Sequence, residues 1–337
     1  MIYRQGRAED AEQYATVRIA AWTQAYQPFF EPGYLESMDP NTIASTWSTT
    51  IEKLDTIVAE EGARIAGYAL LGHSGFEGHE DHLEVKALYV HPDFQASGVG
   101  RGLMARMVRR AIEQGEDRLV IGAFQANSRA RAVYEGWGGQ EIGRSTFSVG
   151  GHAYPDVVYR FLDLRALLDR LVKLNIRPFE PGDDVAALTD LLHRAYADHK
   201  AANRRFLATH QDENKTMERI TEGDGYIVEF EGRVVGTATL YFPEPLPHGD
   251  YNPPGPIASF GQYGVEPELR GFGIGRRLLS FIIERAKEKG ATELALDTAE
   301  TADELIRFYE RQGFIVVGRA DWRPTTNYES VIMSLKI

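Results

Sequence analysis

The chain has 337 residues, of which 43% are hydrophobic and 26% charged, and it contains no cysteine. The length predicts about two domains, and the composition is that of a soluble globular protein. The net charge of −12 argues against a nucleic-acid partner. The absence of cysteine excludes disulfides, thiolate metal sites and a cysteine nucleophile. With no apolar signal segment and no apolar run of about 18 residues, we expect a cytoplasmic protein without a membrane partner.

Both halves begin with the same succession of predicted elements. A short strand and a helix with apolar residues at helical spacing open the first half at residues 2–25 and the second at 176–195. A hairpin follows in each half, because a Gly-containing turn, Glu61-Gly62 or Glu231-Gly232, separates two apolar, β-rich runs.

The next predicted elements are a strand, a Gly-rich loop and an amphipathic helix. The strands are expected at residues 83–90 and 260–265, and another strand, a helix with a tyrosine and terminal strands complete each half. Between the halves, residues 163–173 resemble a helical linker. The six prolines in residues 242–256 predict a stiff loop.

One sequence pattern occurs twice, 175 positions apart. Gln95-Ala-Ser-Gly-Val-Gly-Arg101 recurs as Arg270-Gly-Phe-Gly-Ile-Gly-Arg276, and Tyr134 recurs as Tyr309 at the same offset. A period this long indicates duplicated domains, since solenoids repeat every 20–50 residues or so. The expected organisation is a domain at 1–162, a linker at 163–175 and a second domain at 176–337.

The Gly-rich loops have the form of a phosphate site. Each lies between a strand and a helix, where backbone N–H groups and the helix dipole favour an anion. Gly98 and Gly100, or Gly273 and Gly275, give the backbone freedom and the close approach that such a cradle needs. The spacing GxGxG does not match a dinucleotide-binding loop, and no GK[ST] follows as in a Walker A motif. A tight turn that binds nothing is the remaining alternative.

The loop, of the form [QR]-x-x-G-x-[GA], is followed in each half by Y-x-x-x-G, at Tyr134–Gly138 and Tyr309–Gly313. Together these motifs resemble the GNAT superfamily of N-acetyltransferases, and the order of elements fits over nearly the whole chain. The resemblance implies an α/β fold in which each half is a mixed, mostly antiparallel twisted sheet flanked by helices. It also implies acetyl-CoA as co-substrate.

The resemblance assigns residues to acetyl-CoA. The strand before each loop would hold the pantetheine arm through Leu88, Tyr89 and Val90, and through Tyr263, Gly264 and Val265. The loops would cradle the pyrophosphate through Gln95, Ala96, Ser97, Gly98, Val99, Gly100 and Arg101, and through Arg270, Gly271, Phe272, Gly273, Ile274, Gly275 and Arg276. Asn127 occupies a further position that commonly contacts the cofactor in this family.

The resemblance also places the reaction chemistry. Tyr134 or Tyr309 would protonate the leaving thiolate, or else is an aromatic of the core. Glu84 stands where many family members carry a catalytic carboxylate, with His82 and Lys86 on the same face of the strand; the alternative is a solvated edge carboxylate.

The two halves differ at these positions. The second half has Ser259 opposite Glu84 and Ala302 opposite Asn127, so the first half is the better candidate for chemistry. Asp297 could supply a replacement carboxylate in the second half.

Two further groups have less specific interpretations. His73, His79 and His82 precede the strand of Glu84, but they lie in a polar segment, and we expect no metal site. Four aromatic residues follow the first helix, where the family builds its acceptor pocket, and core packing is expected for at least half of them. They are Trp22, Tyr26, Phe29 and Phe30.

The expected function is direct transfer of acetyl from acetyl-CoA to a primary amine of a small molecule or peptide in a ternary complex. One alternative is a CoA-responsive binding or regulatory module in which one or both sites are catalytically silent. Another is transfer of a longer acyl chain.

Overall fold

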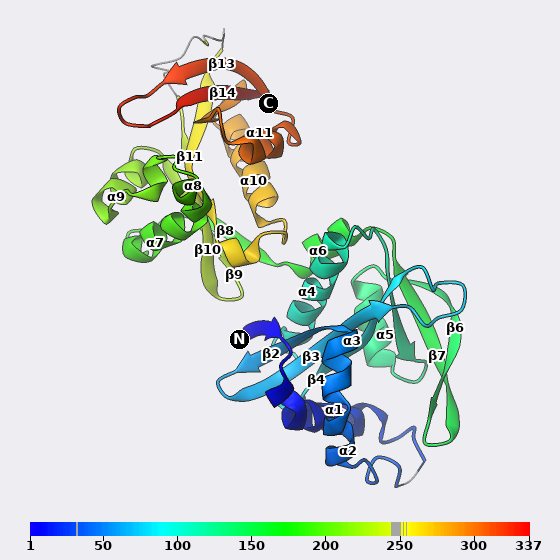
Figure 1. The fold of residues 1–337 in the computed structure, drawn as a ribbon. Coiled ribbons are helices and arrows are strands. Elements are labelled where there is room, and N and C mark those ends of the chain that lie inside the picture. The colour runs from blue at the N-terminus through cyan, green and yellow to red at the C-terminus, as the bar shows by residue number, and fades with distance from the viewer. Residues whose placement is uncertain (32, 244–250, 252, 254) are drawn as a thin grey trace. The chain divides into compact units, whose positions relative to one another are not determined.

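The computed structural model describes residues 1–31, 33–243, 251, 253 and 255–337. The chain folds into two compact units, Met1–Val172 and Lys173–Ile337, and each is a seven-stranded sheet with helices packed on it (Figure 1). The loop predicted at 242–256 falls largely on residues outside this description. Within the described ranges, no helix is long and apolar enough to cross a membrane.

The helices and strands of the two units follow the same order. In the first unit they are β1 (Ile2–Gln5), α1 (Ala11–Tyr26), α2 (Pro40–Ser45), α3 (Trp47–Lys53), β2 (Asp55–Glu61), β3 (Arg64–His73), β4 (Leu83–Val90), α4 (Val99–Glu113), β5 (Leu119–Phe124), α5 (Ser128–Gly136), β6 (Gln140–Val149), β7 (His152–Phe161) and α6 (Leu164–Leu171). In the second they are β8 (Leu174–Pro178), α7 (Val185–Ala195), α8 (Ala197–Ala201), α9 (Glu213–Thr221), β9 (Asp224–Phe230), β10 (Arg233–Tyr241), β11 (Ile257–Val265), α10 (Ile274–Glu288), β12 (Glu293–Ala299), α11 (Asp303–Glu310), β13 (Ile315–Asp321) and β14 (Glu329–Lys336).

The two sheets have the same topology. The first runs β1-β2-β3-β4-β5-β7-β6, and the second, read in the same sense, runs β8-β9-β10-β11-β12-β14-β13. Neighbouring strands are antiparallel except for β4 with β5 and β11 with β12, which are parallel. The predicted fold class, a mixed and mostly antiparallel sheet flanked by helices, is confirmed.

The helix expected between the halves belongs to the first unit. It is α6, whose buried leucines, Leu164, Leu167, Leu168 and Leu171, lie on one face, and it packs against α4. Burial of four leucines in this way favours docking over an extended linker, so the boundary between the units follows Val172.

The two parallel strands of each sheet diverge partway along their length. β4 pairs with β5 only over Leu83–Val85 and Leu119–Ile121, although β4 continues to Val90. The strands of the second sheet part in the same way after Ser259. The β5-facing backbone of β4 from Ala87 onward is therefore not used by the sheet.

Helices α1 and α4 lie on opposite faces of the first sheet. Tyr14 of α1 packs on Tyr68 of β3, with 4.7 Å between ring centroids, whereas a side chain at the adjacent Gly67 would meet Leu103 of α4. Consecutive strand residues point to opposite faces, so the α1 face of β4 and β5 is the one that carries Glu84 and Gly122.

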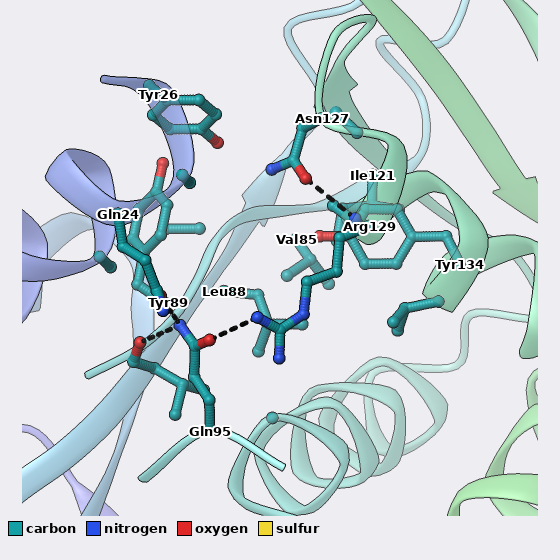
Figure 2. A pocket seen from close by; sticks show the side chains of 18 of the residues that line it. Gln24, Tyr26, Val85, Leu88, Tyr89, Gln95, Ile121, Asn127, Arg129 and Tyr134 are labelled. Atoms are coloured by element: carbon teal, nitrogen blue, oxygen red, sulfur yellow. Dashed lines mark hydrogen bonds between the residues drawn. The ribbon is translucent and has the colours of Figure 1, made fainter. Parts of the chain in front are cut away.

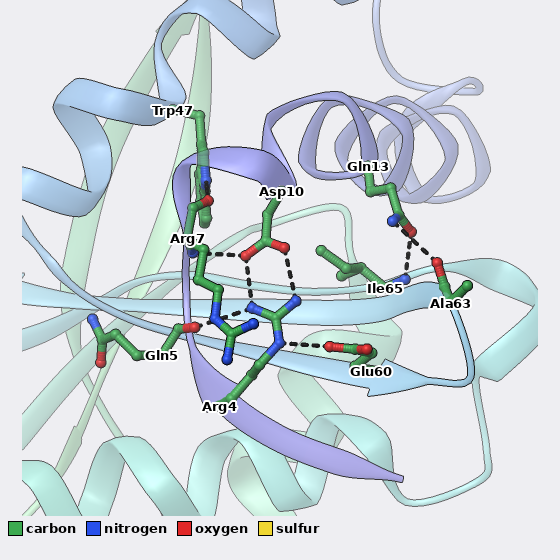
Figure 3. A network of polar contacts seen from close by, with 9 residues as sticks. All are labelled: Arg4, Gln5, Arg7, Asp10, Gln13, Trp47, Glu60, Ala63 and Ile65. Atoms are coloured by element: carbon green, nitrogen blue, oxygen red, sulfur yellow. Dashed lines mark hydrogen bonds and ion pairs between the residues drawn. The ribbon is translucent and has the colours of Figure 1, made fainter.

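An ion-pair network repeats in the two units, and Figure 3 shows that of the first. Arg4 on β1 binds both carboxylate oxygens of Asp10, at 2.8 and 2.9 Å, and its Nε lies 2.5 Å from Glu60. In the second unit Arg177 binds Asp183 at 2.7 and 2.8 Å and Glu229 at 2.9 Å. The network ties the first strand to the start of the first helix, and its signal was an arginine followed by aspartate six positions later in both halves.

Candidate active site

A cavity of about 650 Å³ lies in the first unit where β4 and β5 diverge. It brings together most of the first-half residues predicted to bind acetyl-CoA: Leu88, Tyr89, Val90, Gln95, Ala96, Gly98, Gly100, Arg101 and Asn127 (Figure 2). Val99 is instead buried in the core, and the Ser97 hydroxyl donates to the Phe94 carbonyl; neither lines the cavity.

The Gly-rich loop has the backbone of an anion cradle. Ala96 and Gly98 adopt positive φ angles of 62° and 93°, and the equivalent Gly271 and Gly273 adopt 87° and 74°. α4 begins directly after Gly98, so the cradle and the helix N-terminus coincide.

The second glycine of the loop differs from the first in its backbone conformation. Gly100 lies in the first turn of α4 and is not in the left-handed region. A Cβ there would meet Val90 Cγ2 at an ordinary 3.5 Å. Its contribution is therefore the open space that a missing side chain leaves at the helix start.

A chain of hydrogen bonds runs across the cavity (Figure 2). Gln95 Nε2 donates to Gln24 Oε1 at 2.5 Å and to the Val90 carbonyl at 3.3 Å, and Arg129 donates to Gln95 Oε1 at 2.7 Å. This places the Arg129 guanidinium beside the cradle. Arg129 was not among the predicted site residues, because an exposed arginine near a helix start has no distinguishing sequence signal.

Asn127 and Tyr134 frame the far end of the cavity. Asn127 Oδ1 accepts from Ala130 N at 3.0 Å and caps α5, which leaves the amide nitrogen facing the cavity. Tyr134, on α5, lines the cavity and is 7% exposed. Burial raises the pKa of Tyr134 above its usual range, and Tyr89 and Asp156 add to the shift. Its phenol therefore keeps its proton, as an acid requires.

The carboxylate of Glu84 is buried and hydrogen-bonded. Glu84 is 8% exposed, so the alternative of a solvated edge carboxylate is wrong. Its Oε2 accepts from Lys86 Nζ at 2.7 Å and from Gly75 N at 2.9 Å. Lys86 lines the cavity that contains Tyr134, whereas Glu84 does not, so the structure does not bring the two predicted catalytic residues together directly.

A carboxylate absent from the sequence predictions lies on the same face of the sheet. Asp156 of β7 is 9% exposed, and its Oδ1 has no hydrogen-bond partner among the described residues. Burial raises the pKa of Asp156 to about 6; the Val157 backbone opposes the rise and Glu84 adds to it. Its charge in turn raises the pKa of Tyr134 and of Tyr26.

The second unit repeats the cradle with different surroundings. Tyr263 stands at the position of Leu88; its hydroxyl donates to the Gly275 carbonyl at 2.5 Å, and its own carbonyl accepts from Tyr196 at 3.1 Å. Arg270 pairs with Asp198 at 2.5 Å. The Tyr263 carbonyl and the Arg270 guanidinium, two of the groups predicted to hold a ligand in this unit, are thus bonded to the protein itself.

The two other predicted side chains of the second unit differ in exposure. Tyr309 is buried, which raises its pKa well above the usual range. Asp297 is exposed on β12, and Ser330 and Trp322 favour its charged form.

The predicted acceptor-side aromatics divide evenly. Tyr26 and Phe29 line the cavity, whereas Trp22 and Phe30 are buried and pack with Tyr26. In the described parts of the chain, no three acidic or histidine side chains gather as a metal site. The His82 ring instead pairs with Asp81, at 2.7 Å.

Comparison with known proteins places the chain in a family. The profile of the acetyltransferase (GNAT) family matches residues 19–138 and again 185–314. S-(2-succino)cysteine N-acetyltransferase of Bacillus subtilis is 31% identical over 143 residues, 41% of this chain and 82% of that protein. Mycothiol acetyltransferase of Thermobispora bispora is 26% identical over 257 residues, 75% of this chain and 78% of that protein.

Among solved structures, a GNAT family acetyltransferase of Elizabethkingia anophelis with acetyl-CoA bound matches 49% of this chain and 98% of its own, with 17% identity and a TM-score of 0.35. With two family matches over most of its length, the chain belongs to the GNAT family as a tandem of two such domains. This confirms the predicted class of enzyme, an N-acetyltransferase with acetyl-CoA as co-substrate.

Proposed function

We propose that the first unit transfers acetyl from acetyl-CoA directly to a primary amine of a small molecule or peptide. The observation that carries this proposal is a single cavity lined by the unpaired β4 backbone, the Gly98 cradle, Asn127 and Tyr134. Donor-binding groups and a proton donor thus share one space, as direct transfer requires.

The donor site follows from the unpaired backbone and the cradle. The pantetheine arm lies along Leu88–Val90, whose β5-facing edge is not used by the sheet. The pyrophosphate lies at the start of α4, where Arg101 and Arg129 supply positive charge.

The proton donor is Tyr134. Its raised pKa keeps the phenol protonated at neutral pH, so the hydroxyl can donate to the departing thiolate. Glu84 accepts hydrogen bonds from Lys86 and Gly75 and does not line the cavity. Any interaction of its carboxylate with the acceptor therefore runs through water.

The acceptor is an amine with an amino-acid-like body. The relative from Bacillus subtilis is named for S-(2-succino)cysteine. In this chain the cavity opens to aromatic surface at Tyr26 and Phe29, which favours an apolar or sulfur-containing side chain next to the amine. S-substituted cysteines are therefore the first acceptors to test.

The second unit is the weaker candidate for chemistry. Its equivalent of Leu88 is Tyr263, which bonds to the start of α10, and it has Ser259 and Ala302 where the first unit has Glu84 and Asn127. Acetyl-CoA binding by this unit stays a prediction.

Release of the CoA thiol, followed with Ellman's reagent, tests the proposal. The chain has no cysteine, so the protein adds no background. We expect thiol release from acetyl-CoA with S-substituted L-cysteines or other L-amino acids, and a slower rate with longer acyl donors. Turnover that is unchanged in both Tyr134→Phe and Glu84→Gln would overturn the residue assignment. Binding of acetyl-CoA without turnover on any amine would favour a CoA-responsive regulatory module.

A further inference from the structure

Given an amine acceptor in the first unit, as proposed above, the geometry points to Asp156 as the residue that takes the proton of the acceptor's ammonium group. The transfer runs through water, because Asp156, like Glu84, is not among the residues that line the cavity. The residue lies on β7, outside the sequence motifs of the family, and neither copy of the repeat identifies it by position.

The carboxylate of Asp156 lies beside Gly122 of β5, a residue that lines the cavity. Phe124 of β5 pairs with Asp156, and Gly122 is therefore its diagonal neighbour on the same face. A Cβ at Gly122 would lie only 2.7 Å from Asp156 Oδ2 and 2.8 Å from Phe76 Cζ. The carboxylate and the Phe76 ring thus fill the space that a side chain on β5 would occupy, and Gly122 itself lines the cavity.

The second unit has a carboxylate at the same place, carried by the neighbouring strand. Asp297 of β12 occupies the position of Gly122, 175 residues earlier. Ser330 of β14 pairs with Ala299 as Asp156 pairs with Phe124. Across this diagonal, the first unit therefore has Gly122 and Asp156. The second unit has Asp297 and Ser330. One carboxylate is present at the site in both.

Each of these carboxylates acts on the repeated tyrosine. The charge of Asp156 raises the pKa of Tyr134, and that of Asp297 raises the pKa of Tyr309. Asp297 is exposed and its charged form is favoured by Ser330 and Trp322, whereas Asp156 is buried and its Oδ1 has no partner among the described residues. A purely structural role does not account for Asp156, because a buried carboxylate without a compensating partner destabilises a fold.

Among the residues that the structure describes, the groups that face Asp156 supply no compensating cation. They are Tyr26 from α1, Glu84 and Tyr89 from β4, and Tyr134 from α5. Lys86 is bonded to Glu84. An ammonium group in the cavity beside Gly122 would bring the missing positive charge near the carboxylate, and a bridging water would supply a donor for the unpartnered Oδ1.

The proton balance is complete with these groups. The acceptor arrives as R–NH₃⁺, and the Asp156 carboxylate takes one proton, leaving R–NH₂. The nitrogen lone pair forms the bond to the acetyl carbon and the C–S bond breaks. Tyr134 gives its proton to the thiolate and regains one from the nitrogen. The products are the amide, the CoA thiol and one proton, which Asp156 releases to solvent.

The test moves the carboxylate from one strand to the other. Asp156→Asn and Asp156→Ser are compared with the double variant Gly122→Asp/Asp156→Ser, which copies the arrangement of the second unit. The probe is the S-substituted cysteine or amino acid with the highest wild-type rate, and folding is checked by circular dichroism. We expect each single variant at Asp156 to lower kcat/KM by about 100-fold or more, and the double variant to regain at least about tenfold.

The outcomes are separable. Asp156→Asn within about threefold of wild type would overturn the assignment, as would a folded double variant no more active than Asp156→Ser. If the double variant does not fold, the pH profile of Asp156→Asn decides, since loss of the rising limb near pH 6 is required. Calorimetric binding of acetyl-CoA should be unchanged in Asp156→Asn. If wild type acetylates no amine, the proposed function itself fails; if wild type is active and Asp156→Asn is equally active, only the role of Asp156 fails.

Discussion

Replacing Asp156 by asparagine is expected to stabilise the first unit at alkaline pH and to have a much smaller effect in mild acid. The carboxyl is 9% exposed and has a pKa raised to about 6 by burial, with a further contribution from Glu84. The folded state therefore binds a proton at Asp156 more tightly than the unfolded chain does. Stability is therefore lost progressively as the pH rises from the ordinary pKa of 3.8 to about 6, and the full loss persists above pH 6.

The magnitude follows from the two pKa values. The shift from the ordinary 3.8 to about 6 corresponds to ~3 kcal/mol of destabilisation once the group is ionised in both states. Asparagine carries no charge and has nearly the same shape. The variant should therefore gain up to ~3 kcal/mol at pH 8 and about 1 kcal/mol at pH 4.5, where the folded carboxyl is already protonated.

Urea unfolding followed by tryptophan fluorescence is a suitable assay. Trp22, Trp47 and Trp137 lie in the first unit and only Trp322 in the second, so the signal reports mainly on the unit that contains the substitution. Each variant is compared with wild type at the same pH, which cancels the titration of all other groups.

Asp10→Asn is the matched control within the same unit. Although burial opposes it, the paired Arg4 guanidinium lowers the pKa of Asp10 below its usual range. The sign is therefore reversed: Asp10 contributes stability above its unfolded pKa that is lost as the pH falls, so Asp10→Asn should cost more at pH 8 than at pH 4.5. If Asp156→Asn is less stable than wild type at pH 8, or gains the same amount at both pH values, the reasoning is refuted.

Two further predictions concern the donor site and its proton donor. Tyr134→Phe should lower kcat by about 100-fold with little change in acetyl-CoA binding, because only the acid is removed. Steady-state kinetics measures the first effect and calorimetry the second. A change confined to acetyl-CoA binding would contradict the role of Tyr134 as proton donor. Ala96→Gly should stabilise the first unit by about 1 kcal/mol and Gly98→Ala should destabilise it by a similar amount, since both residues have left-handed φ angles; thermal unfolding measures both, and equal effects of the same sign would be inconsistent with the observed backbone.

Much of the fold could be predicted from the sequence, because its strands are strongly patterned. The strand predicted at residues 83–90 has the bounds of β4, and the hairpins around Glu61 and Glu231 are those of β2–β3 and β9–β10. β6 and β13 were not predicted. β6 is an edge strand that is exposed along most of its length, and such a strand has no buried face to impose an alternating pattern.

The turn of the Gly-rich loop could also be predicted, because Gly98 and Gly100 lie close together in the chain. Its role in binding acetyl-CoA stays a prediction. The proton-transfer groups could be predicted only in part. Glu84 was found on its strand, but its enclosure by Lys86 and Gly75 depends on how a loop folds back. Asp156 could not be recognised, because its relation to Gly122 arises from strand register between β5 and β7. The one available signal was the exchange of Gly122 for Asp297 between the two repeats.

The most direct test of the account is a calorimetric titration of the chain with acetyl-CoA, comparing wild type with Gly98→Glu and the matched Gly273→Glu. A carboxylate in the first cradle would meet the pyrophosphate at the start of α4. The account predicts that wild type binds acetyl-CoA, that Gly98→Glu removes one equivalent of binding, and that Gly273→Glu leaves this equivalent in place. Stoichiometry and heat that are the same in Gly98→Glu as in wild type would contradict an acetyl-CoA site in the first unit.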